Sequence, residues 1–180
     1  MEQHFSVGAG GWLEVMPELF IPQSQCRYRQ RTTIEVAAGG EMFFVETLAP
    51  GRVARGESFQ FSEVEWEFAL RYAGGLIARE RFALRPSDES IASLRNPFPT
   101  GYYASCYVIT PRISPDDGVW RAIHGLTTES VLVGVSRLVA GGSTIKILAI
   151  DSIVLARTLG TIRTLLARFL LALLCATRKL

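Results

Sequence analysis

The segment 64–72 constrains the fold most, because apolar side chains occupy every second position along it. This is the period of a β-strand with one buried face and one exposed face. The buried set is Val64, Trp66, Phe68, Leu70 and Tyr72, and the alternating set is Glu65, Glu67, Ala69 and Arg71. A glycine loop at 73–75 leads into a second expected strand at 76–84, so the two segments predict a β-hairpin.

Other segments extend the β prediction over most of the chain. Strands are expected over 12–16, 28–36, 42–48, 102–110, 131–138 and 144–150, with turns between them that are rich in glycine and proline. We expect a short α-helix near 116–124 and a long one near 152–176, with Asp151 or Ser152 as the cap of the second. The sequence therefore predicts a mainly β fold with two α-helices, in a single domain over 1–180.

Composition narrows the class of protein further. Of the 180 residues, 48% are hydrophobic and 20% are charged, which is a globular balance, and a net charge of +2 is too small for a general nucleic-acid binder. The three cysteines, Cys26, Cys106 and Cys175, are too far apart in sequence to predict a disulfide framework or a zinc site. The first residues show no signal-peptide pattern, so we expect a cytoplasmic protein.

The apolar C-terminal region must be weighed against membrane insertion. Its apolar run, 165–176, contains Arg168 and is shorter than the roughly 20 residues that a spanning helix requires. We therefore expect a helix that packs on the protein and no membrane partner. A peripheral membrane protein anchored by residues 152–180 is the alternative.

No catalytic motif is complete in the sequence. The stretch 134–138 resembles a nucleophile elbow around Ser136, but it lacks the second glycine and lies in an expected strand. The two histidines, His4 and His124, are far apart in sequence. We therefore do not expect an enzyme, and a hydrolase that uses Ser136 or one of the cysteines is the alternative.

Three glutamates occupy strand faces that are otherwise apolar. Glu80 shares a face with Leu76, Ala78, Phe82 and Leu84, Glu46 shares one with Met42, Phe44 and Leu48, and Glu14 lies between Trp12 and Met16. A carboxylate removed from water without a partner costs several kcal/mol, so each must pair with an arginine, bind a cation, line a wet cavity or stay protonated. Seventeen arginines make the ion pair easy to form, and periodicity alone leaves both an ion pair and a cation passage open.

The same regions contain a longer ordered pattern. Its pieces are 12–18 with Ile21 and Pro22, 46–57 with Phe59 and Phe61, 76–81, 131–138, 146–149 and the closing helix. In this order and spacing they resemble the UreD family of urease accessory proteins, called UreH in some organisms. The most specific piece contains Gly51, Arg52, Gly56 and Glu57. Members of the family usually carry roughly a further third of a chain before this region, so we expect a UreD-like domain that lacks its N-terminal third.

The resemblance implies a fold and a role. The fold is a β-helix-like body of stacked strands and hairpins with two helices. The role is non-catalytic and lies in nickel insertion into apo-urease, where such proteins bind the urease apoprotein and the partner UreF, and through UreF the GTPase UreG. The resemblance also implies a water-filled internal tunnel, in which Glu46 and Glu80 match acidic positions and Glu14 is a weaker match.

The residue chemistry suits a nickel ion in transit. Carboxylates and water are weaker ligands for Ni²⁺ than imidazole or thiolate. We therefore expect transient Ni²⁺ near Glu46, Glu80 and Glu14 and no tightly bound cofactor. In the C-terminal helix, Arg157, Arg163 and Arg168 occur without an acidic residue, so they predict either a docking surface for a partner or a solvated basic face.

Overall fold

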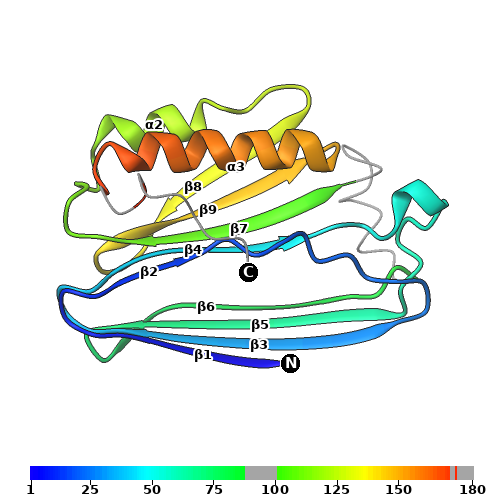
Figure 1. Ribbon diagram of the computed structural model, residues 1–180, viewed down its shortest axis with the longest axis horizontal. Coiled ribbons are helices and arrows are strands. Elements are labelled where there is room, and N and C mark those ends of the chain that lie inside the picture. The colour runs from blue at the N-terminus through cyan, green and yellow to red at the C-terminus, as the bar shows by residue number, and fades with distance from the viewer. Residues whose placement is uncertain (88–100, 171–172, 174–180) are drawn as a thin grey trace.

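Two stacked β-sheets and a layer of two helices make up the protein, and the computed structural model describes residues 1–87, 101–170 and 173 (Figure 1). The strands are β1 (Glu2–Val7), β2 (Trp12–Val15), β3 (Arg27–Val36), β4 (Glu41–Leu48), β5 (Glu63–Tyr72), β6 (Gly75–Leu84), β7 (Tyr102–Ile109), β8 (Val131–Arg137) and β9 (Gly142–Ala149). The helices are α2 (Gly118–His124) and α3 (Ser152–Ala167), and a 3-10 turn covers Val53–Arg55. The mainly β class with two α-helices is confirmed.

The first five strands alternate between the two sheets. The first sheet has the order β1-β3-β5-β6, and the second has the order β2-β4-β7-β9-β8. Strands β1, β3 and β5 are parallel to one another, and so are β2 and β4, so the chain coils from one sheet to the other and back. Antiparallel strands complete both sheets. This coil is the β-helix-like body that the resemblance implies.

Glycine turns connect β1 to β2 and β3 to β4, and the two turns stack on each other. The backbone N–H of Gly10 donates to the carbonyl of Gly39 at 3.1 Å, and these residues have φ of 70° and 77°. Such positive φ values favour glycine. A Cβ on Gly40 would lie 2.9 Å from the carbonyl oxygen of Gly8, so the close approach of successive turns of the coil also requires glycine.

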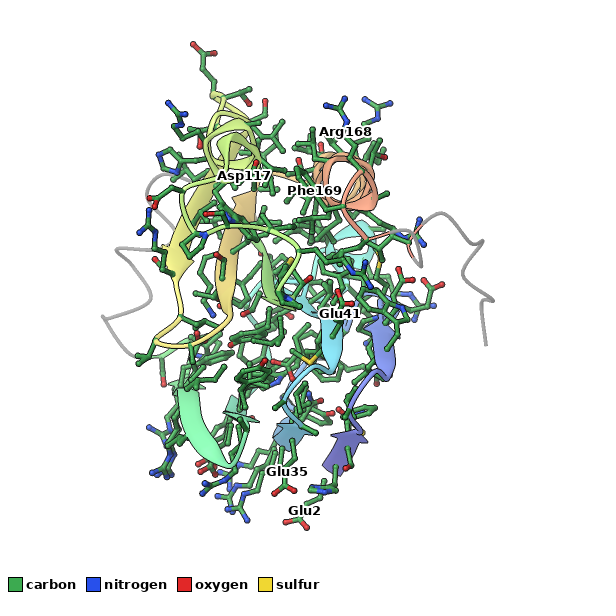
Figure 2. All side chains as sticks on the ribbon, turned by 90° about the vertical axis from the view of Figure 1, so that its left-hand side faces the viewer. Glu2, Glu35, Glu41, Asp117, Arg168 and Phe169 are labelled. Carbon is green, nitrogen blue, oxygen red and sulfur yellow. The ribbon has the colours of Figure 1, made fainter. Side chains whose placement is uncertain are left out.

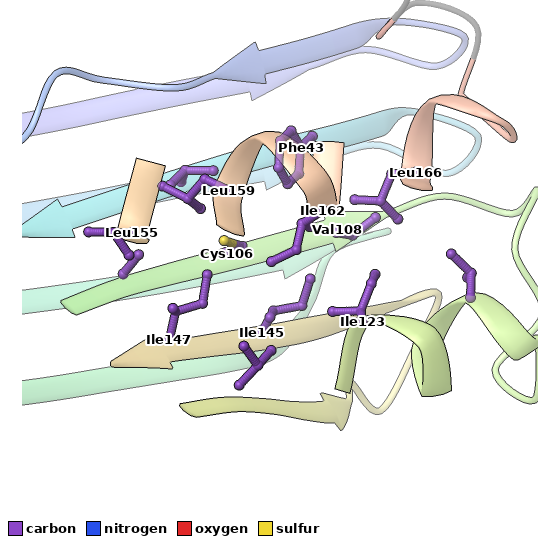
Figure 3. Close-up of a cluster of buried hydrophobic side chains, with 14 of the residues drawn as sticks. Phe43, Cys106, Val108, Ile123, Ile145, Ile147, Leu155, Leu159, Ile162 and Leu166 are labelled. Atoms are coloured by element: carbon purple, nitrogen blue, oxygen red, sulfur yellow. The ribbon is translucent and has the colours of Figure 1, made fainter. Parts of the chain in front are cut away.

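Helices α2 and α3 cover the outer face of the second sheet (Figure 1). Figure 3 shows Leu159 and Ile162 of α3 and Ile123 of α2 in one cluster with Cys106 and Ile145 of the second sheet. All of these side chains are buried. Burying an aliphatic side chain contributes roughly 1.5–3 kcal/mol, so this cluster fixes the helices on the sheet. None of the helices within the described ranges has the length and apolarity needed to cross a membrane.

Both helices are shorter than the sequence predicts. Helix α2 begins at Gly118 rather than near 116, because Asp117 is its N-cap and accepts a hydrogen bond from the Val119 N–H at 2.9 Å. Asp151 caps α3 in the same way, at 2.7 Å from the Val154 N–H. The predicted end near 176 is wrong, because α3 ends at Ala167 and the following turn buries Leu170 in the core. Residues 171–172 and 174–176 lie outside the described part of the chain.

Two features of the first sheet differ from the prediction. Strand β1 was not expected, and it forms because its backbone pairs with β3 although half of its side chains are exposed. In the β5–β6 hairpin the register shifts after Leu70, which lies opposite Ala78, while Arg71 lies opposite Leu76. This β-bulge rotates Leu76 away from the core, and 49% of its surface is exposed. The face predicted for Leu76 is therefore wrong.

Rows of charged side chains cover the outer face of the first sheet. Glu65 pairs with Arg29 and Arg81, and Glu67 pairs with Arg31 and Arg79. Figure 2 shows Glu2 and Glu35 projecting from the same face. Arg79 and Arg81 thus point away from the interior, as the alternation of β6 predicts.

Candidate functional site

A belt of polar side chains crosses the interior between the two sheets. We call it the polar belt; its members are Gln3, Gln30, Thr32, Glu46, Glu80, Ser105 and Lys146. In the second sheet Glu46 lies opposite Ser105, which lies opposite Lys146. In the first sheet a single strand separates Thr32 from Glu80. Because these rows run across the strands, the polar belt follows the axis of the coil.

The polar belt divides the apolar interior between the sheets into two clusters. One cluster includes Ile34, Phe44, Phe68, Leu70 and Tyr107, and the other includes Leu48, Phe61, Val64 and Trp66. In β4, Glu46 replaces the apolar side chain expected between Phe44 and Leu48. A layer of polar groups across a core is costly unless each group has a partner, so the contacts of each carboxylate decide what the belt can do.

Glu46 is held by neutral donors. Its side chain is only 8% exposed, and it accepts hydrogen bonds from Thr32 Oγ1 at 2.9 Å and Gln30 Nε2 at 3.0 Å. Burial raises the pKa of Glu46 above its ordinary value, while the nearby Trp66 indole, the hydrogen bonds from Thr32 and Gln30 and the charge of Lys146 oppose the rise. Within the described ranges no basic side chain forms an ion pair with Glu46. The alternation of the strand leaves open whether Glu46 pairs with an arginine or lines a cation passage. The donors found here are neutral, so an arginine does not compensate this carboxylate.

Glu80 is held by an ammonium group. Its carboxylate pairs with Nζ of Lys146, which reaches across from β9 in the opposite sheet. The same Nζ lies 2.6 Å from Ser105 Oγ and 3.3 Å from the Tyr107 hydroxyl. It also lies 5.1 Å from the centre of the Tyr107 ring, within reach of a cation–π interaction. Glu80 is thus paired, but with a lysine rather than with the arginine that the sequence suggested.

Cavities lie along the polar belt. Gln3, Gln30, Glu46 and Trp66 help to line one of about 130 Å³. Glu46 and Trp66 also line a narrow space of about 10 Å³ that reaches Glu80, which is room for about one water molecule. Beyond it, a mostly apolar cavity of about 220 Å³ shares the lining residues Leu48, Phe82 and Tyr103 with the narrow space. The two carboxylates therefore face one narrow space between two larger cavities.

The buried indole of Trp66 points to water in this space. Trp66 is 5% exposed, and its Nε1 has no hydrogen-bond partner of normal geometry in the part of the chain that the structure describes. The same indole is close enough to Glu46 to stabilise the ionised carboxylate. A buried N–H rarely lacks an acceptor, so a water molecule beside Glu46 would satisfy it.

Glu14 lies outside the polar belt. It faces the helical layer on the other side of the second sheet, where Arg163 Nε and its terminal nitrogen hold the carboxylate at 2.7 and 3.2 Å. Glu14 thus forms the glutamate–arginine ion pair that was one of the two possibilities for these glutamates. Arg163 thus connects α3 to β2, whereas Arg157 and Arg168 are exposed, and Figure 2 shows Arg168 at the outer edge of the helical layer.

The motif residues Gly51, Arg52, Gly56 and Glu57 form a rigid loop. Arg52 holds Glu57 through two hydrogen bonds of 2.7 and 2.6 Å, and Glu57 also accepts a 3.2 Å bond from the Ser24 N–H. The guanidinium keeps the pKa of Glu57 below its ordinary value. Gly51 has φ of 142°, and Gly56 ends the 3-10 turn with φ of 76°. The loop therefore anchors the chain at the end of β4, close to the belt, through its own backbone and one ion pair.

The residues considered for catalysis are not brought together. Ser136 is exposed on β8 and makes no hydrogen bond to a described histidine, acid or lysine. Cys26 and Cys106 are free thiols, and burial raises the pKa of Cys106 to about 12, which makes it a poor nucleophile. Among the described residues, no group of three or more His, Cys, Asp or Glu side chains is placed to hold a metal ion.

Sequence reasoning missed the groups that hold the two carboxylates. Lys146 falls within the family pattern at 146–149, and it is also one of two lysines and lies between Thr144 and Leu148 on a strand face. Gln30 and Thr32 likewise share the inner face of β3 with Ile34. A polar side chain on an otherwise apolar strand face is the sequence signal that could have identified these groups. The prediction used this signal for the glutamates alone.

Comparison with known proteins gives one family. A family model described as UreD urease accessory protein matches residues 1–178. The proteins named urease accessory protein UreD from Opitutus terrae, Deinococcus radiodurans and Herpetosiphon aurantiacus are 38%, 36% and 33% identical to the chain. These alignments cover 99%, 51% and 62% of this chain, and 65%, 33% and 38% of those proteins. The chain thus spans less than two thirds of the length of the relatives that it matches.

The two motif glycines allow a test of the loop. In Gly51→Ala the new Cβ would lie 2.5 Å from the Glu57 carbonyl oxygen, so we expect a loss of more than about 2 kcal/mol in the free energy of unfolding. In Gly56→Ala nothing lies within 4 Å of the new Cβ, and only the positive φ is strained, so a loss of about 1 kcal/mol is expected. Urea unfolding of the two variants measures the difference; equal losses would contradict the close approach at Gly51.

The raised pKa of Glu46 predicts a pH dependence of stability. The folded chain holds the proton of Glu46 more tightly than the unfolded chain, so its contribution to stability declines as pH rises through the two pKa values. Glu46→Gln removes this decline, and the variant should gain stability relative to the wild type as pH rises above about pH 4. Urea unfolding across this range measures the difference.

Glu65→Gln supplies a control of opposite sign. Arg81 and Arg29 lower the pKa of Glu65, so the wild type should gain stability relative to this variant as pH rises. If the Glu46→Gln and wild-type curves ran parallel while the Glu65→Gln curve diverged, the buried carboxylate would not be held as described.

Proposed function

Since the chain belongs to the UreD urease accessory protein family, we propose that it acts in the maturation of urease as a scaffold rather than as a catalyst. The polar belt is the structural observation that supports this proposal most. Its carboxylates, Glu46 and Glu80, face a narrow space between two cavities.

We propose that the polar belt is a passage for Ni²⁺ on its way to urease. A passage must offer oxygen ligands without a closed ligand cage, because a tightly held ion would not be released. Glu46 and Ser105 of the second sheet and Glu80 of the first sheet supply such oxygens around one narrow space, which has room for water. Glu14 belongs to a different surface, since Arg163 already binds both of its oxygens, so we assign it to the attachment of α3.

We propose further that the chain binds the urease apoprotein and UreF, and through UreF the GTPase UreG. The exposed face of α3 is the surface that we assign to one of these contacts, because it presents Arg157 and Arg168 and an exposed Ile153. Arginine and an exposed aliphatic side chain are typical of contact surfaces between proteins. The opposite side of the molecule carries arginines that are already paired with glutamates.

The passage predicts a loss of urease activation when its carboxylates are neutralised. We expect Glu46→Gln or Glu80→Gln to lower the nickel content and activity of co-expressed urease on the order of tenfold. Each substitution removes a negatively charged oxygen from the narrow space that the two glutamates line. Glu35→Gln, an exposed glutamate on the outer face of the same fold, is the matched control and should not change activation. Normal nickel loading in both interior variants, with normal folding by circular dichroism, would refute the passage.

The docking surface is tested separately by charge reversal. We expect Arg157→Glu combined with Arg168→Glu to weaken co-purification with UreF or with apo-urease on the order of tenfold, since opposite charges steer and hold such contacts. Arg71→Glu, on the outer face of the first sheet, is the control. Undiminished recovery of both partners by the double variant would place the docking surface elsewhere.

A further inference from the structure

Lys146 is the single basic side chain that the described structure brings into the polar belt. It extends from β9, and its Nζ reaches Glu80 of the opposite sheet. The aromatic rings of Tyr103 and Tyr107 flank it, with centres 5.9 and 5.1 Å from Nζ. The side chain of Lys146 is one-third exposed, so the ammonium group lies where the interior meets solvent.

The three donors of this ammonium all have oxygen acceptors. They are the Glu80 carboxylate of β6 and the Ser105 and Tyr107 hydroxyls of β7. Oxygen atoms converging on one positive charge are also what a hard or borderline divalent cation needs. Lys146 therefore occupies the position that a cation bound to Glu80 would take.

The charges of the polar belt do not balance. Glu46 and Glu80 provide two carboxylates, whereas Lys146 provides one ammonium that pairs with Glu80 alone. The positive charge of Lys146 nevertheless stabilises the ionised form of Glu46. A divalent cation in the belt would meet Glu46, which has no ion pair among the described residues, and Glu80, which is paired with Lys146. The cation therefore competes with Lys146 for Glu80.

We infer that Lys146 is a resident counter-cation that gates the polar belt, and that a divalent metal ion binds Glu80 by displacing its ammonium. The displaced side chain has room to move toward solvent, because a third of it is already exposed. This competition keeps the affinity for the metal ion low. Without the ion, Glu80 stays paired with Lys146. The unpartnered Nε1 of Trp66 marks the neighbouring space, lined by Glu46 and Glu80, as a place for the ion's water.

The biological meaning of this gate rests on the proposed nickel passage, whereas its test needs only the chain itself. Lys146→Met keeps the length of the side chain and removes its charge, so Ni²⁺ should bind on the order of tenfold more tightly than to the wild type. Lys146→Arg keeps a positive charge and should bind Ni²⁺ no more tightly than the wild type. Equilibrium dialysis of each purified variant against nickel chloride measures the dissociation constants.

A second substitution ties any gain to the polar belt. Glu80→Gln combined with Lys146→Met removes both charges of the pair, and it should abolish the gain in affinity. Urea unfolding of Lys146→Met with and without nickel chloride gives an independent reading, since an unpaired Glu80 should make the stability of this variant dependent on nickel.

Two results would overturn the gate. One is an unchanged nickel affinity in a folded Lys146→Met variant; the other is a gain that persists when Glu80 is also replaced. The proposed function fails differently, through normal urease activation by the Glu46 and Glu80 variants, so the two failures are distinguishable.

Discussion

A carboxylate buried between two β-sheets must be compensated, and the interior of this protein is arranged around that requirement. Glu46 lies in the core because the alternation of β4 turns its side chain inward. Burying an apolar side chain at this position would cost less free energy. Thr32 and Gln30 face it from the first sheet and donate to it. The second carboxylate, Glu80, is compensated by Lys146 from the opposite sheet. Side-chain contacts between the two sheets thus compensate both carboxylates.

The coil makes this arrangement possible. Parallel strands β1, β3 and β5 put equivalent positions in rows, so Gln3 and Thr32 share a row that continues through Phe68 to Glu80 of β6. The stacked glycine turns keep successive strands in that register. Outside the belt the other charges are used differently: Glu14 attaches α3, Glu57 closes the motif loop, and the outer face of the first sheet carries its own arginine–glutamate rows. Family membership and the polar belt are the two observations on which the proposed role in nickel transfer rests.

Local patterns allowed much of the fold to be predicted. Alternation over 64–72 and glycine at the turns are local signals, so the strands other than β1, the hairpin and the in-facing positions of Glu46 and Glu80 could be derived from the sequence. The partner of Glu80 could not, because Lys146 is 66 residues away and meets it only when the sheets stack. The side of the sheet on which Glu14 lies depends on where α3 packs. The bulge that exposes Leu76 and the end of α3 at Ala167 also follow from tertiary packing rather than from periodicity.

Anomalous diffraction at the nickel absorption edge, from crystals soaked in millimolar nickel chloride, locates bound nickel in the protein. If nickel passes through the polar belt, an anomalous peak lies between the carboxylates of Glu46 and Glu80, and the Lys146 ammonium has moved away from Glu80. Peaks confined to surface histidines or cysteines, with the Lys146–Glu80 pair intact, would contradict the nickel passage.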